Sequence, residues 1–160
     1  MKKTNATRIV ESHNIPFTLH EYNDDGEHKL ALGAAAKTAE KMGADPNQVF
    51  KTIVMRTETK EICVFCQSAM QQVNLKKART AANCKEISSV KPEELLSLTG
   101  YVRGGCSPIG MKRQFRTFID ESALLYDEIY ISAGARGQQL ALNPNDLIKL
   151  TNATVCDLQL

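Results

Sequence analysis

A glycine-rich stretch in the middle of the chain is the first feature whose residue types suggest chemistry. Residues 99–110 read Thr-Gly-Tyr-Val-Arg-Gly-Gly-Cys-Ser-Pro-Ile-Gly. Glycine tolerates a positive φ and lets another molecule approach bare backbone N–H groups. Gly104 and Gly105, flanked by Arg103 and Lys112, therefore predict a cradle for a carbonyl or phosphate group with cations at its rim. Composition alone leaves open the alternative of an ordinary surface loop without a ligand.

Lys51 is the second candidate, because it interrupts the apolar stretch 49–55. Strand alternation would place Val49, Lys51 and Ile53 on one face, and residues 50, 52 and 54 on the other. A lysine on an inward face is costly unless it is paired or has a function. The alternative is that this strand lies at a sheet edge, with Lys51 pointing into water.

The cysteines and histidines give weaker signals. Cys63 and Cys66 have the spacing of a zinc or redox pair, but three positions apart in a strand they point to opposite faces. We therefore interpret both as packing residues and expect no metal site. Cys106 is a candidate nucleophile only if Arg103 lowers its pKa. The histidines (13, 20 and 28) fit no Ser-His-Asp pattern.

Length and composition indicate one ordinary globular domain, residues 1–160. The chain has 160 residues, 42% of them hydrophobic and 24% charged, which is typical of soluble domains. Five scattered cysteines are consistent with reduced thiols in the cytoplasm. Neither a signal peptide nor a membrane-span pattern is evident, so we expect a cytoplasmic protein without a membrane partner. Nucleotide-binding glycine motifs are also missing.

Positive charge is concentrated in the middle of the chain. Residues 71–116 contain nine Lys or Arg and three Glu, a net +6, although the whole chain carries only +2. Such a segment indicates a polyanion or phosphate partner, with a solvated basic face as the alternative. The helix predicted to contain Lys76 and Lys77 would suit phosphate contacts.

Short helices and short strands alternate along the predicted elements. We expect helices over 4–13, 31–42, 75–82, 93–98 and 144–150, with short helical turns near 46–48 and 120–125. We expect strands over 17–22, 49–55, 61–67, 84–88, 115–119, 129–132 and 138–142, and a possible last strand near 155. The two strands at 49–67 form a predicted hairpin. This mixture favours an α+β sheet or barrel over a doubly wound fold.

Five segments together resemble the YbaK/EbsC family of aminoacyl-tRNA deacylases, and most closely its EbsC-like branch. The combination of Val-Phe-Lys-Thr with Thr-Gly-Tyr-x-x-Gly-Gly-x-Ser-Pro-x-Gly is specific. The resemblance implies a single α+β domain whose mixed, mostly antiparallel sheet closes towards a barrel flanked by short helices. It implies hydrolysis of a misattached amino acid, chiefly cysteine, from tRNA(Pro) without a cofactor. The segments are His20-Glu-Tyr22, Gln48-Val-Phe-Lys-Thr52, Leu75-Lys-Lys77, residues 99–110 and residues 130–137.

The resemblance also implies roles for individual residues. Lys51 would hold the terminal adenosine or its phosphate and orient the ester, while Gly104 and Ser132 would contact the aminoacyl group. These three are the expected catalytic residues. The expected substrate-binding residues are Tyr22, Thr52, Gly105, Gly134 and Gln139. The expected tRNA-binding residues are Lys76, Lys77, Arg103, Lys112, Arg113 and Arg136.

The implied mechanism needs no protein nucleophile, because the substrate cysteine's own thiol attacks its ester carbonyl. Two departures leave the preferred amino acid open. Gln139 stands where some family members carry an acid, and residues 32–34 lack the aromatic residue often found there. Alanine or serine are alternative substrates, and water would then be the nucleophile. A non-catalytic module that binds aminoacyl-tRNA or a synthetase is the alternative from another class. The expected partner is tRNA, with prolyl-tRNA synthetase as a second candidate partner and no DNA.

Overall fold

A computed structural model describes residues 3–22 and 32–159, and gives the backbone alone for residues 32–36. The polar loop expected at 23–26, His28 and the side chains near Ala34 lie outside what is described. Within the described residues, no helix is long and apolar enough to cross a membrane.

Three antiparallel strands form the smaller sheet. Strand β7 (Gln138–Leu142) lies between β1 (Phe17–Glu21) and β6 (Ile129–Ser132). Its register sets His20 opposite Gln139, and Ser132 opposite Gln139 on the other side. The expected strands in this part of the chain are therefore confirmed to within one residue.

Five strands form the larger sheet in the order β4-β2-β3-β5-β8. The predicted hairpin is confirmed as β2 (Phe50–Thr57) paired with β3 (Ile62–Ser68), and β4 (Ile87–Ser89) is antiparallel to the far end of β2. Strands β5 (Arg116–Asp120) and β8 (Thr154–Cys156) continue the sheet in parallel. The α+β class and the mostly antiparallel pairing are confirmed.

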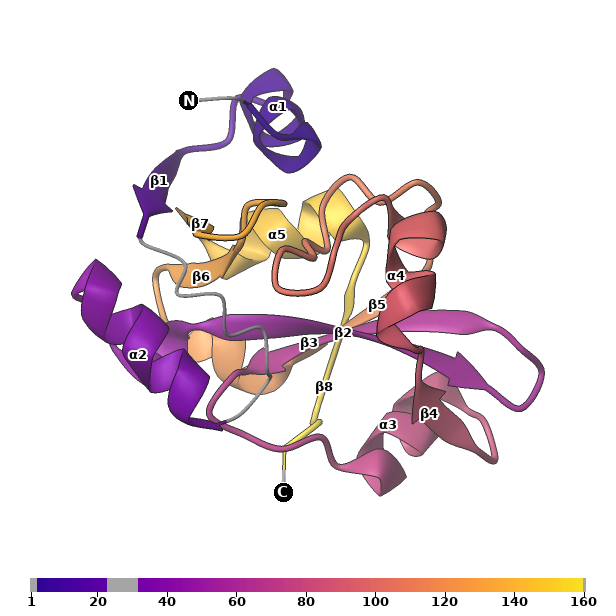
Figure 1. Cartoon of the computed structure of the whole chain (residues 1–160). Helices are drawn as coiled ribbons and strands as arrows, with labels where there is room; N and C mark the ends of the chain where they lie inside the picture. The colour runs from indigo at the N-terminus through magenta and orange to yellow at the C-terminus, as the bar shows by residue number, and fades with distance from the viewer. Residues whose placement is uncertain (1–2, 23–31, 160) are drawn as a thin grey trace.

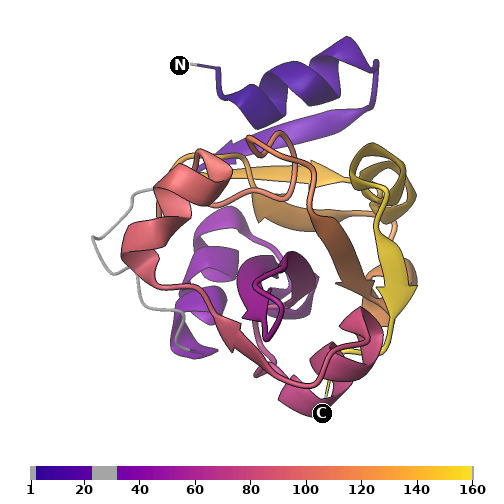
Figure 2. The ribbon, with the colours of Figure 1, turned by 90° about the vertical axis from the view of Figure 1, so that its right-hand side faces the viewer.

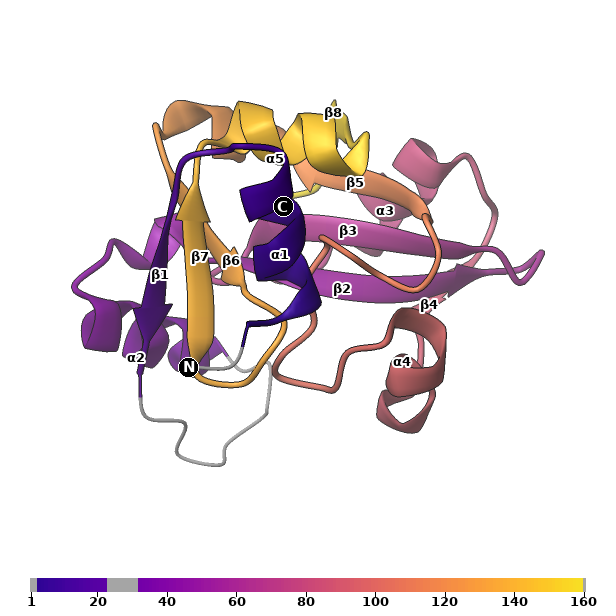
Figure 3. The same ribbon diagram turned by 90° about the horizontal axis from the view of Figure 1, so that it is seen from above.

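The expected barrel closure is wrong. The two sheets meet at an isolated bridge between Val49 and Tyr130, and β1 and β8 remain unpaired edges within the described strands. A closed barrel requires a continuous ladder of tilted strands around the whole circumference. Strands β4 and β8 are only three residues long, so they offer few hydrogen bonds for closure. Figure 3 shows β1 and β7 running across β2 and β3 instead of continuing around them.

Several helices begin where a polar side chain caps the first turn. The side chains of Thr4, Asn74 and Asn143 accept hydrogen bonds from backbone N–H groups at the starts of α1, α3 and α5. Helix α2 lies beside the bridge end of β2, whereas α4 lies towards the hairpin end (Figures 1 and 2). The helices are α1 (Asn5–Ser12), α2 (Leu32–Met42), α3 (Leu75–Ala82), α4 (Pro92–Thr99) and α5 (Pro144–Thr151), with 3-10 turns η1 (Pro46–Gln48) and η2 (Glu121–Leu125).

Two apolar cores pack against opposite faces of the β2–β3 hairpin. Cys66 belongs to the core formed with α1, α5 and the smaller sheet, whereas Cys63 belongs to the core formed with α3. The prediction that these two thiols point to opposite faces and serve in packing is therefore confirmed. By the same alternation, Phe50 on β2 packs in the core shared with the smaller sheet, whereas Ile53 packs in the core on the opposite face.

Candidate functional site

Strand register places Lys51, Ser132 and Gln139 on one face of the sheets. Lys51 and Ser132 each lie two residues beyond the bridge that joins Val49 to Tyr130. Side chains return to the same face every second residue, and residues directly opposite one another share a face. Ser132 is opposite Gln139 in the smaller sheet. A cation, a hydroxyl and an amide from three strands therefore share a face.

Lys51 is held by the end of the segment that follows β3. Its Nζ donates a 2.7 Å hydrogen bond to the carbonyl oxygen of Gln71, which also accepts from Gln67 Nε2 at 3.2 Å. Lys51 is half-buried, and burial lowers the pKa of its ammonium. Strand β2 is not an edge of the larger sheet, although its second neighbour, β4, pairs only with Met55–Thr57 and leaves the Lys51 end beside β3 alone. Lys51 is therefore a partly desolvated cation with hydrogen-bonding capacity left over.

Gln139 carries an unpaired acceptor. Its side chain is 8% exposed, and its Oε1 has no hydrogen-bond partner among the described residues. A buried polar atom without a partner costs about 1–3 kcal/mol, so such atoms are uncommon unless a ligand or water completes them. The neighbouring Ser132 Oγ accepts from Gly134 N at 3.1 Å, which leaves its own hydrogen free to donate. Beside Lys51, these two side chains thus offer one acceptor and one donor.

An aromatic pair flanks these polar groups, and sequence reasoning assigned it no function. The rings of His20 and Tyr130 stack with their centroids 5.2 Å apart and an interplanar angle of 28°. His20 lies opposite Gln139 and Tyr130 forms the bridge to Val49, so both belong to the face of Lys51. Alternation within each strand was readable from the sequence. The sequence did not show which strands lie side by side, so the contact between His20 and Tyr130 was not predicted.

Tyr22 lies next to this face, just beyond β1. Its backbone N donates a 2.9 Å hydrogen bond to the carbonyl oxygen of Gly137, and the ammonium of Lys41 on α2 lies 5.8 Å from its ring centroid. Thr52 differs, because alternation turns it towards Cys66 on the opposite face of β2 from Lys51. Its place in the same pocket as Lys51 stays a prediction.

The two glycine-rich turns pack against each other. A Cβ at Gly105 would lie 3.0 Å from the backbone N of Arg136, so a larger residue would have to push the two backbones apart by a few tenths of an ångström. Arg136 Nε donates to the carbonyl oxygen of Arg103 at 2.9 Å, which brings these two predicted tRNA-binding residues together. Gly104 beside them is exposed with φ of 85°. The stretch 99–110 is thereby anchored to the turn that follows Ser132, at the end of the shared face.

Gly134 is tightly enclosed in the second turn. Its φ is +99°, and a Cβ there would lie 2.8 Å from the ring of Tyr101. The role suggested by these contacts is to bring the turns together. Its substrate contact stays a prediction, as does that of Gly105.

Cys106 does not have the surroundings of a nucleophile. Burial raises the pKa of its thiol to about 12. The thiolate is the reactive form, so this group is protonated and unreactive at neutral pH. Cys106 is therefore not placed to act as a thiolate, and the groups described on the shared face supply binding, orientation and hydrogen bonding.

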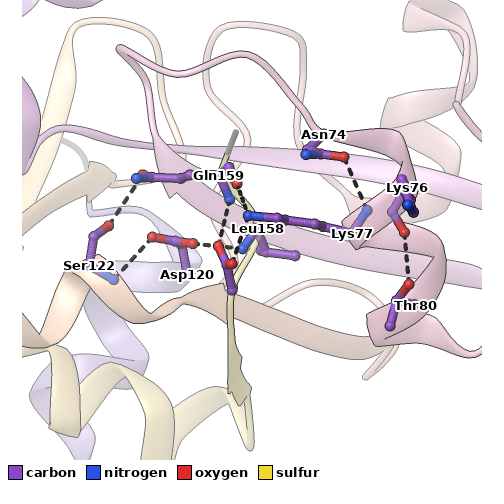
Figure 4. A network of polar contacts seen from close by, with 9 residues as sticks. Asn74, Lys76, Lys77, Thr80, Asp120, Ser122, Leu158 and Gln159 are labelled. Carbon is purple, nitrogen blue, oxygen red and sulfur yellow. Dashed lines mark hydrogen bonds and ion pairs between the residues drawn. The ribbon is translucent and has the colours of Figure 1, made fainter.

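The predicted tRNA-binding lysines of α3 differ in their surroundings. Lys77 Nζ makes an ion pair with Asp157 at 2.7 Å and also donates to the carbonyl oxygen of Gln159 (Figure 4). Lys77 thereby links α3 to the C-terminal segment. Asp120 also binds this segment, because its carboxylate accepts a 2.7 Å hydrogen bond from the backbone N of Leu158. Lys76 is exposed on the same helix. The basic middle of the chain is thus divided over separate surfaces, and Lys112 and Arg113 lie on another one.

Comparison with known proteins decides the family. Residues 31–150 match the family model described as the aminoacyl-tRNA editing domain. The chain belongs to this family. Its members include the YbaK proteins, so the resemblance found in the sequence is confirmed.

Two relatives and two solved structures show the extent of the likeness. The chain is 37% identical over 157 residues to the Enterococcus faecalis protein named "Putative Cys-tRNA(Pro)/Cys-tRNA(Cys) deacylase EbsC", covering 98% of this chain and 93% of that one. It is 23% identical over 133 residues to Bacillus subtilis YwhH, covering 83% and 84%. A structure described as "a putative trans-editing enzyme for prolyl tRNA synthetase" superposes with a TM-score of 0.83 at 25% identity, covering 100% and 99%. The hypothetical protein APE2540 shares the fold, with a TM-score of 0.84 at 18% identity over 98% and 100%.

Proposed function

We propose that this editing-domain protein hydrolyses the ester of mischarged Cys-tRNA(Pro) in the cytoplasm. The observation that carries the proposal is the face shared by Lys51, Ser132 and Gln139, which joins a partly desolvated cation to a free donor and an unpaired acceptor. An aminoacyl ester offers the complementary groups: phosphate or ribose oxygens, a carbonyl oxygen and an α-ammonium. The name of the 37% identical relative supports cysteine as the amino acid.

Each group has a task in this proposal. The Lys51 ammonium binds the terminal adenosine or its phosphate, and the Ser132 hydroxyl donates to the ester carbonyl. The α-ammonium donates to Gln139 Oε1, which completes the unpaired acceptor. A donor aimed at the developing oxyanion is typically worth a factor of about 10²–10³ in rate. The remaining acceleration comes from holding the substrate thiol against its own carbonyl. The Gly104 backbone is a further proposed donor to the carbonyl.

The chemical step uses the substrate's sulfur. The cysteine thiol attacks the ester carbonyl, a carbon–sulfur bond forms, and the carbon–oxygen bond to the ribose breaks. The thiol proton ends on the departing ribose oxygen, leaving free tRNA and a cyclic thioester, which water then opens to cysteine. Such editing has a physical rationale, because a synthetase pocket separates substrates of similar size by only about 1–3 kcal/mol.

The mechanism is tested with tRNA(Pro) charged with cysteine, alanine, serine, proline or 2-aminobutyrate. The last matches cysteine in size but lacks the thiol. We expect cysteine to be released at least about a hundredfold faster than 2-aminobutyrate, because only cysteine carries the attacking group. Equal release of the two would exclude substrate-thiol attack and favour water as the nucleophile.

A second substrate class has one observation in its favour. The unpaired Gln139 Oε1 is a neutral acceptor that could hold a water molecule near the carbonyl as well as an α-ammonium. A deacylase for alanine or serine would use that water. In the same panel, release of alanine or serine faster than cysteine would support this second candidate.

The Lys51→Ala variant distinguishes the two deacylase candidates from a third possibility, a non-catalytic module that binds aminoacyl-tRNA or a synthetase. We expect the variant to retain the fold and to lose deacylation. A protein that leaves every aminoacyl-tRNA in the panel intact, before any substitution, would be a binding module. We propose tRNA as the partner and prolyl-tRNA synthetase as a second one, and a pull-down with and without tRNA(Pro) tests the latter.

A further inference from the structure

A basic hollow lies at the opposite end of β2 from the candidate site. It encloses about 800 Å³ between the β2–β3 hairpin, α4 and the segment leading to β5. Figure 2 looks onto the turn of this hairpin, with α4 to one side. Among the side chains that line it are four cations, Arg56, Lys60, Lys112 and Arg113, and one carboxylate, Glu94. The hollow therefore carries a strong net positive charge.

Most of that charge is uncompensated. Arg56 makes a 2.7 Å ion pair with Glu94, and this contact lowers the pKa of the carboxyl. Lys60, Lys112 and Arg113 have no hydrogen bond or ion pair to any side chain in the described part of the protein. Their positions are nevertheless set by the fold. Lys60 lies in the hairpin turn with φ of 67°, and the aliphatic stem of Lys112 packs on Gly100.

Distance along β2 relates the hollow to the shared face. Arg56 follows Lys51 by five residues in one strand, which spans about 16 Å at about 3.3 Å per residue, and this odd separation turns the two side chains to opposite faces of β2. Stacked nucleotides rise by about 3.4 Å each, so an RNA that contacts both residues needs at least roughly five of them. An RNA whose 3′ end reaches Lys51 would therefore pass around β2 before phosphates further up its strand reach the hollow. The segment 99–113 joins the two places, because Gly105 packs on Arg136 beside the shared face and Lys112 lines the hollow.

We propose that this hollow binds the sugar–phosphate backbone of the tRNA upstream of the charged 3′ end. The inference rests on the proposed function for its substrate, and adds Arg56 and Lys60 to the RNA-binding surface. Ammonium and guanidinium groups contact phosphate oxygens without reading sequence. The hollow thus contributes affinity for the tRNA, while the shared face recognises the aminoacyl ester.

The test measures binding of uncharged tRNA to Lys60→Gln/Arg113→Gln, which alters two exposed side chains. We expect affinity to fall about tenfold, and the slope of log affinity against log salt to become shallower by about 1.5, because each lost phosphate contact changes the slope by about 0.7–0.9. The matched control is Arg8→Gln/Lys149→Gln, which removes two exposed charges from α1 and α5 and should change affinity less than twofold. Lys60→Glu alone provides a second variant, also expected to weaken binding.

Further outcomes decide against the inference. Equal weakening in the control pair would show a general charge effect, and unchanged affinity in both hollow variants would remove the hollow from the RNA surface. Retained tRNA affinity with lost binding to prolyl-tRNA synthetase would instead make the hollow a docking site for an acidic protein. Because uncharged tRNA is the ligand, these results are independent of deacylation. Failure of the proposed enzyme activity would appear separately, in the wild-type release assay.

Discussion

Replacing Lys51 with methionine should separate catalysis from stability. The ammonium makes one hydrogen bond, to the carbonyl oxygen of Gln71, and a bond to a charged group contributes about 1.5–3 kcal/mol. Two effects offset its loss. Gln67 Nε2 continues to donate to the same oxygen, and methionine removes the desolvation that lowers the pKa of Lys51. Methionine also keeps much of the apolar stem. We therefore expect the free energy of unfolding to change by less than about 1 kcal/mol.

Deacylation should respond much more strongly. If the cation orients the ester, its loss removes about 2.7–4 kcal/mol of transition-state stabilisation, which corresponds to a 10²–10³-fold lower kcat/KM. The assay is release of amino acid from Cys-tRNA(Pro) alongside urea denaturation of each variant. Lys149→Met, at an exposed position on α5, removes the same charge and should leave both quantities unchanged. A Lys51→Met enzyme within threefold of wild type would refute the assigned role. If the free energy of unfolding falls by as much as the transition-state stabilisation, about 2.7–4 kcal/mol, the role of Lys51 is structural.

Three further predictions follow from single groups. Burial lowers the folded-state pKa of Lys51 below its ordinary 10.5, so activity that needs the cation should fall as pH rises through a value below 10.5. In that same window the unfolded chain binds more protons, so wild-type stability should rise with pH relative to Lys51→Met; an opposite slope in denaturation from pH 8 to 10.5 would contradict this. Gln139→Met should stabilise the free protein by about 1 kcal/mol, because it removes an unpaired buried acceptor, and should raise KM about tenfold; unchanged unfolding would indicate that Oε1 is already satisfied. Cys106→Ala should retain kcat within threefold, since the buried thiol stays protonated; a hundredfold loss would restore it as a nucleophile.

Local elements were predictable because their signals are local. Asn74 and Asn143, which cap helices in the structure, stand directly before the helices expected at 75–82 and 144–150, and alternation around Lys51 marked a strand with two distinct faces. The opposite orientations of Cys63 and Cys66 followed from the same period of two. These features depend on neighbours within a few residues, so no knowledge of the fold was needed.

The candidate site depended on contacts that no local pattern records. The bridge from Val49 to Tyr130 joins residues far apart in sequence, and only this bridge shows that Lys51 shares a face with Ser132 and Gln139. The stacking of His20 on Tyr130 also depends on strand order, as does the absence of barrel closure among the described strands. Strand order is set by packing of the whole chain and leaves no local pattern in the sequence.

The charged residues show most clearly what the sequence determined and what the tertiary structure decided. Composition established that residues 71–116 are basic, which is a sum over residue types. The fold then paired Lys77 with Asp157 and gathered Lys112 with Arg56 and Lys60 from outside that segment. Sequence therefore determined the element types, the amount of charge and the motifs of an editing domain. Tertiary structure decided which cations are neutralised and which meet, because electrostatic interactions depend on distance in space and not on separation along the chain.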